Sequence, residues 1–318
     1  MSGITRPFVS VCMITYNHER VISQAIEGVL MQQAGFAFEL VVGEDCSTDS
    51  TRRICEEYAQ KYSEVISLLP SEKNLGIVTN FIRTLQACKG KYIALCEGDD
   101  FWTDPGKLHK QITFLEKNHD YAMVCTDYNT FNIVNSHEVQ GFLKSKYNLT
   151  CETDITFEDY IFNRYYIRTL TVTFRSEILK LYFNQVERSI SMNPMVGDLP
   201  LWLFILTRFK VKYWPMSTGT YRISPNTASR QTHTGDRLAF QETIMKILEY
   251  FIKKEALPER YMRKVQVQRK IYTMEYHARQ RKPLKVLNDF LLLVFTGNLR
   301  LKAFSTLRAA FKKEELPL

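Results

Sequence analysis

The segment Tyr92–Leu108, YIALCEGDDFWTDPGKL, carries the strongest signals for the fold and chemistry of this chain. It begins with the apolar run Tyr92–Cys96, which is typical of a buried strand, and its end opens the helical pattern Pro105–Lys117, with proline in the first turn. Between strand and helix lie three carboxylates in four residues, Glu97, Asp99 and Asp100. Such a cluster is unfavourable unless a cation or hydrogen bonds offset the repulsion.

This acidic segment has two possible roles. Hard divalent cations such as Mg²⁺ or Mn²⁺ bind carboxylates and substrate phosphates together, and Gly98 would let a ligand approach the backbone closely. The alternative is a solvated acidic loop that caps the following helix.

Apolar runs and helical patterns alternate on both sides of this segment. We expect strands at Phe8–Ile14, Phe38–Gly43, Val65–Leu69, Tyr92–Cys96 and Tyr121–Cys125. Helices are expected at His18–Gln33, Thr51–Tyr62, Gly76–Cys88 and Pro105–Lys117. Repeated strand–helix–strand units predict an α/β fold with a mostly parallel sheet. Ligands of such sheets bind beyond the carboxyl ends of the strands.

Two other loops therefore follow strands at the expected ligand edge. Glu44 and Asp45 come directly after the second strand, where a carboxylate can accept hydrogen bonds from a ribose or a base. Ser47, Thr48 and Asp49 are equally suited to capping the next helix. Tyr16, after the first strand, could stack on a base.

The chain beyond Tyr128 is less regular in sequence. We expect Asn129–Asp154 to be irregular and mobile, because it is mostly polar. Further elements are expected as a strand at Thr171–Phe174, a helix at Asp198–Phe209, a strand at Val211–Met216, and mostly helix from Arg237 onward.

Composition and charge exclude several classes of protein. The 318 residues are 45% hydrophobic and 24% charged, which is ordinary globular usage. The net charge of +8 is concentrated in residues 253–318, which hold 16 basic and 6 acidic residues. The rest is nearly neutral, which argues against nucleic acid as a substrate. No apolar stretch approaches the ~18–20 residues needed to span a bilayer, and no signal peptide is visible. Seven cysteines without CxxC spacing suggest a reducing, cytoplasmic compartment.

Missing motifs narrow the chemistry further. The chain contains no GxG, GxxxxGK, HExxH or GxSxG, so NAD enzymes, P-loop kinases, zinc peptidases and serine hydrolases are poor candidates.

Three segments together resemble the family 2 glycosyltransferases of the GT-A fold, and most closely the bacterial enzymes that build surface polysaccharides. These are VSVCMITYN at Val9–Asn17, ELVVGEDCSTDST at Glu39–Thr51, and YIALCEGDDFWTDPGKL at Tyr92–Leu108. The resemblance runs to about Ser229. It implies a three-layer α/β sandwich over residues 1–235, followed by a helical extension over 236–318.

The resemblance also implies an activity. Such enzymes transfer a sugar from a nucleotide-diphosphate donor to a glycan or lipid-linked acceptor, with inversion, and usually need Mn²⁺ or Mg²⁺. Two alternatives stay open. One is a sugar nucleotidyltransferase, although its usual GxGxR-type loop is missing, and the other is a non-catalytic nucleotide-sugar-binding assembly subunit.

Family roles can be carried over position by position. Residues matched to the nucleoside pocket and donor site are Ile14, Thr15, Tyr16, Glu44, Asp45, Asn74, Gly76, Glu97 and Gly98. Glu97, Asp99 and Asp100 occupy the metal-and-ribose DxD region, with Glu97 in place of the more usual aspartate. Asp99 is the first choice for metal or ribose contact.

The segment Met195–Trp202 resembles the family region that supplies the catalytic base, which would be Asp198. Asp198 is the only carboxylate in Ser189–Pro215, and the alternative is a helix N-cap without a catalytic role. A departure follows at Tyr221–Ser229, where Ser224 replaces a frequent histidine. Either the metal would then have fewer protein ligands, or Arg222 would do more of the diphosphate binding.

The basic tail allows two interpretations. Leu284–Phe295 and Leu299–Phe311 combine leucine-rich and basic helical faces, which suit peripheral contact with the inner face of an anionic membrane. The alternative is packing on the catalytic domain with a solvated basic face.

Overall fold

The computed structural model describes residues 7–163, 167–186, 197–224, 234–295 and 306–307. The chain divides into two compact units, Met1–Pro225 and Asn226–Leu318.

The first unit is built on one ten-stranded sheet with the principal order β3-β2-β1-β4-β9-β6-β10-β5. The strands on this path are β1 (Val9–Thr15), β2 (Phe38–Glu44), β3 (Ile66–Leu68), β4 (Tyr92–Leu95), β5 (Phe101–Trp102), β6 (Tyr121–Asn132), β9 (Thr173–Arg175) and β10 (Lys210–Ile223). The first four strands pair in parallel, as do β6 and β10. The short β9 runs antiparallel between β4 and β6.

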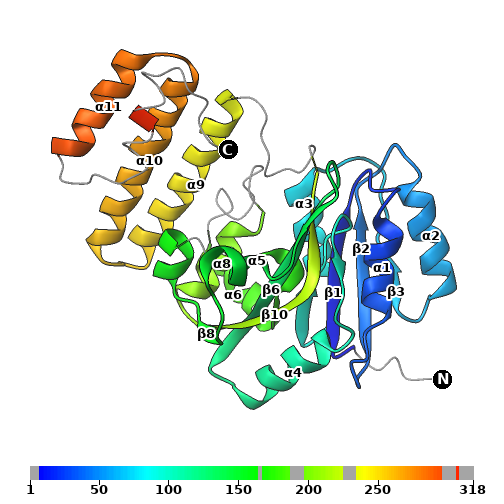
Figure 1. Cartoon of the computed structure of the whole chain (residues 1–318). Coiled ribbons are helices and arrows are strands. Elements are labelled where there is room, and N and C mark those ends of the chain that lie inside the picture. Colours follow the sequence, from blue (N-terminus) through cyan, green and yellow to red (C-terminus); the bar gives the residue numbers. More distant parts are fainter. Residues whose placement is uncertain (1–6, 164–166, 187–196, 225–233, 296–305, 308–318) are drawn as a thin grey trace. The chain divides into compact units, whose positions relative to one another are not determined.

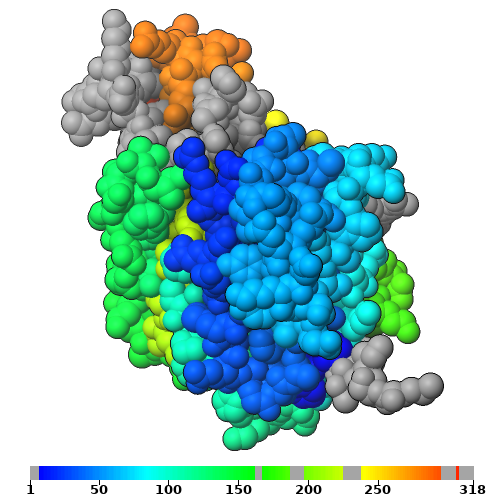
Figure 2. Space-filling view, turned by 90° about the vertical axis from the view of Figure 1, so that its right-hand side faces the viewer, coloured from blue at the N-terminus to red at the C-terminus, as the bar shows by residue number. Residues whose placement is uncertain are grey.

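Helices cover both faces of this sheet (Figure 1). They are α1 (Ile22–Leu30), α2 (Thr51–Lys61), α3 (Ile77–Ala87), α4 (Lys107–Lys117), α5 (Phe142–Tyr147), α6 (Glu177–Gln185) and α8 (Leu199–Leu206). The α1 and α2 helices lie on one side of β1 and β2 and α3 on the other; seen from the α1–α2 side, the blue N-terminal segments form a continuous surface (Figure 2). The predicted α/β sandwich with a largely parallel sheet is confirmed.

The core of this unit comes from fully buried strands, as their apolar runs predict. All seven residues of β1 are buried, and so are all four of β4. Strands covered on both faces read as continuous apolar runs rather than as alternating patterns.

The prediction that Asn129–Asp154 is irregular is wrong. The β6 strand continues to Asn132 and pairs with β7 (His137–Val139), which is followed by α5 and by β8 (Thr153–Asp154). Buried polar side chains hold this segment together. The Asp127 carboxylate accepts backbone N–H groups of Leu143 and Lys144 at 2.8 and 2.9 Å, and Asn129 accepts that of Gly141 at 3.0 Å. The segment is ordered although its sequence is polar, because its polar groups form hydrogen bonds within the protein.

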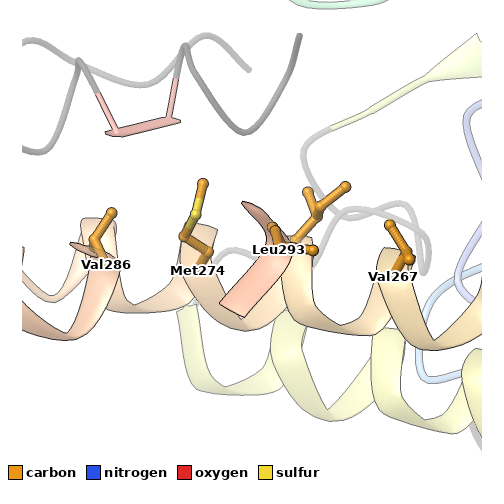
Figure 3. Close-up of a cluster of buried hydrophobic side chains, with 5 residues drawn as sticks. Val267, Met274, Val286 and Leu293 are labelled. Carbon is orange, nitrogen blue, oxygen red and sulfur yellow. The ribbon is translucent and has the colours of Figure 1, made fainter. Parts of the chain in front are cut away.

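The described part of the second unit includes the helices α9 (Thr234–Lys254), α10 (Glu259–Arg279) and α11 (Pro283–Phe295). A buried cluster joins the last two, with Val286 and Leu293 of α11 beside Val267 and Met274 of α10 (Figure 3). Arg269 of α10 forms ion pairs with Glu242 at 2.9 Å and Glu249 at 2.6 Å on α9. None of the described helices combines the length and apolar content needed to cross a membrane. Apart from Thr306 and Leu307, the expected helix at Leu299–Phe311 lies outside the described residues.

Candidate active site

The loops after β1, β2 and β4 meet at the carboxyl edge of the sheet. Thr15 and Glu44, the last residues of β1 and β2, are paired in register. The backbone N–H of Asp45 donates to the Thr15 carbonyl at 3.0 Å, and that of Gly98 donates to the Ile14 carbonyl at 2.9 Å. The first strand therefore holds both acidic loops at one edge.

Gly98 is needed for this close approach. A Cβ atom at position 98 would lie 2.6 Å from the Thr15 side chain, which is inside van der Waals contact. A larger residue would push the acidic loop away from β1.

Three carboxylates converge in this loop. One ligand atom from each of Glu97, Asp99 and Asp100 lies within 4.8 Å of the other two. Asp100 is fully buried, and its Oδ1 accepts the backbone N–H of Arg222 at 2.8 Å. Its Oδ2 is buried and has no hydrogen-bond partner among the described residues. Such an orphaned oxygen is costly unless a ligand such as a cation satisfies it.

The pKa shifts of these carboxyls also indicate a site for positive charge. Loss of solvent and the neighbouring carboxylates of Asp99 and Asp198 raise the pKa of Glu97 to about 8, although Thr169 donates to its Oε2 at 2.8 Å. Burial, followed by the charges of Asp99 and Glu97, also raises the pKa of Asp100. This loop is poised to accept positive charge.

Asp198 lies close enough to this cluster to raise the pKa of Glu97, although it comes from the N-terminus of α8, a hundred residues further along the chain. Its side chain does not cap the helix; instead its Oδ2 accepts the indole N–H of Trp202 at 3.0 Å. Loss of solvent raises the pKa of Asp198, and the Trp202 hydrogen bond partly opposes this. The carboxyl is therefore a stronger base than a solvated aspartate.

The first acidic loop differs, because its carboxylates are engaged by the protein itself. Asp45 is 2% exposed and accepts the backbone N–H groups of Leu75 and Gly76 at 2.8 and 2.9 Å, while Asn74 donates to its carbonyl at 3.0 Å. Gly76 has a positive φ of 81°, which favours glycine. The buried Glu44 accepts the backbone N–H of Ser47 through Oε1 at 2.6 Å. Its Oε2 has no hydrogen-bond partner among the described residues, but it lies 3.5 Å from a guanidinium nitrogen of Arg52 and is engaged by that ion pair.

Arg222 is anchored to the second loop. Its guanidinium donates to the Asp99 carbonyl at 2.6 Å and to the Gln24 side chain, and lies 4.4 Å from the Phe101 ring centre. Ser224 follows the end of β10. Ile14 and Thr15 are buried at the end of β1, whereas Tyr16 is 41% exposed.

Arg168 also lies near these carboxylates and was not predicted from the sequence. Its guanidinium lies 4.3 Å from the Tyr221 ring centre, and its charge lowers the pKa of Glu97, Asp100 and Asp198 against the effect of burial. It precedes the single 3₁₀ turn Thr169–Thr171, and no motif or periodicity marks it. The same turn supplies Thr169, the hydrogen-bond partner of Glu97.

Comparison with known sequences decides the family. The sequence profile described as Glycosyl transferase family 2 matches residues 10–188, which is more than half of the chain. The chain belongs to this family. The region covers both acidic loops and Arg168 but ends before Asp198.

Individual relatives are similar over shorter stretches. An uncharacterized protein of Mycobacterium tuberculosis is 36% identical over 170 residues, which is 53% of this chain and 47% of that protein. WfgD of Escherichia coli, named a UDP-Glc:alpha-D-GlcNAc-diphosphoundecaprenol beta-1,3-glucosyltransferase, is 33% identical over 133 residues, which is 42% of this chain and 49% of WfgD. The chain thus spans about half the length of the curated relatives it matches.

Solved structures show the same fold. TarS 1–349 of Staphylococcus aureus, in complex with UDP-GlcNAc, has a TM-score of 0.59 at 15% identity over 97% of this chain and 93% of that one. The mannosyltransferase PcManGT of Pyrobaculum calidifontis, in complex with GDP-Man and Mn²⁺, has a TM-score of 0.59 at 14% identity, over 98% of this chain and 77% of that one. The predicted GT-A fold is confirmed.

Proposed function

We propose that this family 2 glycosyltransferase transfers a sugar, with inversion, from a nucleotide-diphosphate donor to a hydroxyl group of a glycan or lipid-linked acceptor. The observation that carries the proposal is the acidic loop Glu97–Asp100, with its orphaned Asp100 oxygen, beside the carboxyl of Asp198. It combines a site for positive charge with a basic group, which is what sugar transfer from a diphosphate requires.

A divalent cation fits this loop. Glu97, Asp99 and Asp100 would hold it, because their oxygens are already gathered and Asp100 Oδ2 has no other described partner. Carboxylates are the ligands that Mg²⁺ and Mn²⁺ prefer, and PcManGT was solved with Mn²⁺. When bound, the ion would neutralise charge on the leaving diphosphate.

Asp198 is the proposed general base. Its carboxylate takes the proton of the acceptor hydroxyl while that oxygen attacks the anomeric carbon and the bond to the diphosphate oxygen breaks. Attack on the face opposite the leaving group inverts the anomeric centre. Its raised pKa suits this role, because a more basic carboxylate accepts the proton more readily.

The first acidic loop is proposed to shape the nucleoside pocket. Ile14, Thr15 and Tyr16 would line it, and the exposed Tyr16 ring is available for stacking on the base. Asp45 would position Asn74 and Gly76 for contact with the nucleotide, since it holds their loop through backbone hydrogen bonds. Glu44 and Gly98 support the two loops, and Arg222 positions Asp99.

The acceptor is proposed to be linked to a lipid carrier. WfgD acts, by its name, on a diphosphoundecaprenol-linked sugar, which supports an acceptor on a lipid carrier. We place the reaction at the cytoplasmic face of the membrane, in surface polysaccharide synthesis, with a catalytic domain over residues 1–235 and an extension over 236–318.

Titration calorimetry tests the proposal. Purified protein is titrated with UDP, GDP, CDP and dTDP, each with and without Mn²⁺, and donor hydrolysis is then followed with the sugar nucleotides of the diphosphate that binds. We expect saturable binding of one diphosphate that strengthens with Mn²⁺, and slow hydrolysis that depends on Asp198. Binding without any turnover of donor in the presence of candidate acceptors would favour the non-catalytic subunit. A folded sample that binds none of the four contradicts the proposal.

A further inference from the structure

The α11 helix has two apolar faces, and in the described part of the chain only one of them is buried. Val286 and Leu293, seven residues apart, are fully buried against α10 (Figure 3). Leu284 and Leu291, also seven residues apart, lie on another face with Leu292. Their exposed fractions are 78%, 42% and 44%, so a row of leucines faces solvent.

Three basic residues surround the start of this exposed row of leucines. Arg281 and Lys282 precede the helix, Lys285 lies in its first turn, and all three are exposed. In the part of the chain that the structure describes, these three side chains take part in no ion pair. The helix has one acidic residue, Asp289, and its Oδ2 is 2.7 Å from Nδ1 of His277 on α10. The charge left for a partner is therefore positive.

We propose that this face of α11, with Leu284, Leu291, Leu292 and the cations Arg281, Lys282 and Lys285, docks on the surface of an anionic phospholipid membrane. Exposed leucines insert at the boundary between headgroups and acyl chains, and the cations bind the phosphates of the headgroups. This inference deepens the proposed function, on whose lipid-linked acceptor it builds, but it can be tested without activity.

The charge pattern favours lipid over a second copy of the chain. A two-fold contact through this face offers the cations no free acidic partner on α11, because its one carboxylate, Asp289, is already paired with His277, and a parallel arrangement would also bring the two cation clusters together. A bilayer that contains anionic lipid instead offers negative charge along the whole row. The short apolar row and the absence of a spanning helix among the described residues fit peripheral binding rather than insertion across the membrane.

Co-sedimentation of the full chain with vesicles tests this inference. One vesicle contains phosphatidylglycerol in phosphatidylcholine, and the other is phosphatidylcholine alone. We expect binding to the anionic vesicles, weakened by high salt because the attraction is partly electrostatic. The triple variant Arg281→Gln/Lys282→Gln/Lys285→Gln should bind roughly a hundredfold more weakly, since each surface cation contributes about fivefold. Leu284→Ser/Leu291→Ser/Leu292→Ser should also lose at least about tenfold.

A matched control separates this surface from general charge. Lys61, Lys117 and Lys180 are exposed in the first unit, and their triple change to Gln alters the net charge equally. It should leave vesicle binding within about twofold. Binding of the nucleoside diphosphate, measured on the same samples, shows that each variant is folded and reports the proposed function separately.

Three results would overturn the inference. The first is that the unmodified chain does not bind anionic vesicles, and the second is that the control variant loses as much binding as the cation variant. The third is that the leucine substitutions dissociate an oligomer in sedimentation analysis without changing vesicle binding. The last result would assign the face to a second copy of the chain.

Discussion

The two acidic loops at the carboxyl edge of the sheet look alike in sequence and differ in structure. Each follows a buried strand with carboxylates, at Glu44–Asp45 and at Glu97–Asp100. In the first, both oxygens of Asp45 accept backbone N–H groups of the loop before α3. In the second, an oxygen of Asp100 is buried without a described partner, and the pKa of Glu97 is raised to about 8 by loss of solvent and by Asp99 and Asp198.

The carboxylates of the first loop therefore stabilise the structure of the site, whereas those of the second loop are available to bind a ligand. A carboxylate held by backbone N–H groups is satisfied and rigid, and it orders the segment that it binds. A group of carboxylates that repel one another stores an electrostatic cost that a cation can relieve. We therefore expect substitutions in the two loops to change different properties.

The largest expected effect lies beside the second loop, at Asp198. We expect Asp198→Asn to lower turnover by about 10²–10⁴ while the donor binds normally, because an amide cannot take the acceptor proton. Steady-state kinetics and calorimetry on the same sample measure the two quantities. Asparagine can still accept the Trp202 hydrogen bond through its side-chain oxygen, so a purely structural Asp198 would tolerate the change. Unchanged turnover would remove Asp198 from the base role.

The next effect concerns the cation. Asp99→Asn should weaken Mn²⁺-dependent binding of the nucleoside diphosphate by at least about tenfold, the lower end of the effect of losing even an outer-shell partner of a metal. Binding without the ion should change little. Calorimetry with and without Mn²⁺ gives both values. An equal loss in the two conditions would show that Asp99 contacts the nucleotide rather than the ion.

A smaller and different effect is expected in the first loop. Asp45→Asn places an NH₂ group against one of two backbone donors, which should lower the free energy of unfolding by about 1–3 kcal/mol. The increase in affinity that Mn²⁺ produces should persist. Denaturant titration and calorimetry provide the two readouts. Unchanged stability with a lost preference among nucleotides would instead place the Asp45 carboxylate against the base.

The contrast between the two acidic loops also shows which features of the fold and the site can be predicted from the sequence. Buried parallel strands such as β1 and β4 are predictable, because continuous apolar runs bounded by turns allow few other structures. The acidic loop after β4 was found because an acidic cluster at a strand end is visible in sequence. The different states of Asp45 and Asp100 were not predictable, since they depend on Leu75, Gly76 and Arg222, which only the fold brings near.

Two further features lie beyond sequence reasoning for the same reason. The order in Asn129–Asp154 depends on Asp127, whose carboxylate binds backbone groups sixteen and seventeen residues away. Arg168 influences three carboxylates from a segment without a motif. In both cases a polar side chain acts through long-range contacts that leave no local pattern.

The smallest expected effect is a pH dependence that only the second loop should show. Glu97 has a pKa of about 8, above the ordinary value of 4.5, so it is mostly protonated at pH 7. The proton must leave before the carboxylate can bind an ion, and affinity for Mn²⁺ should therefore rise with pH and level off above about 8. Between pH 7 and 8 we expect a gain of roughly fivefold from this single group.

The variant Glu97→Gln provides the control, because it removes the titrating group but keeps the hydrogen bond that Thr169 donates. It should bind the ion more weakly and with little pH dependence in this range. Its free energy of unfolding without ion should depend less on pH than that of the unmodified chain. A folded-state pKa above the unfolded value means that the native state holds an extra proton between about pH 4.5 and 8, so stability falls as pH rises through this window. A pH dependence that persists in Glu97→Gln would assign the titration to Asp100 or Asp198, the other two carboxyls whose pKa is raised.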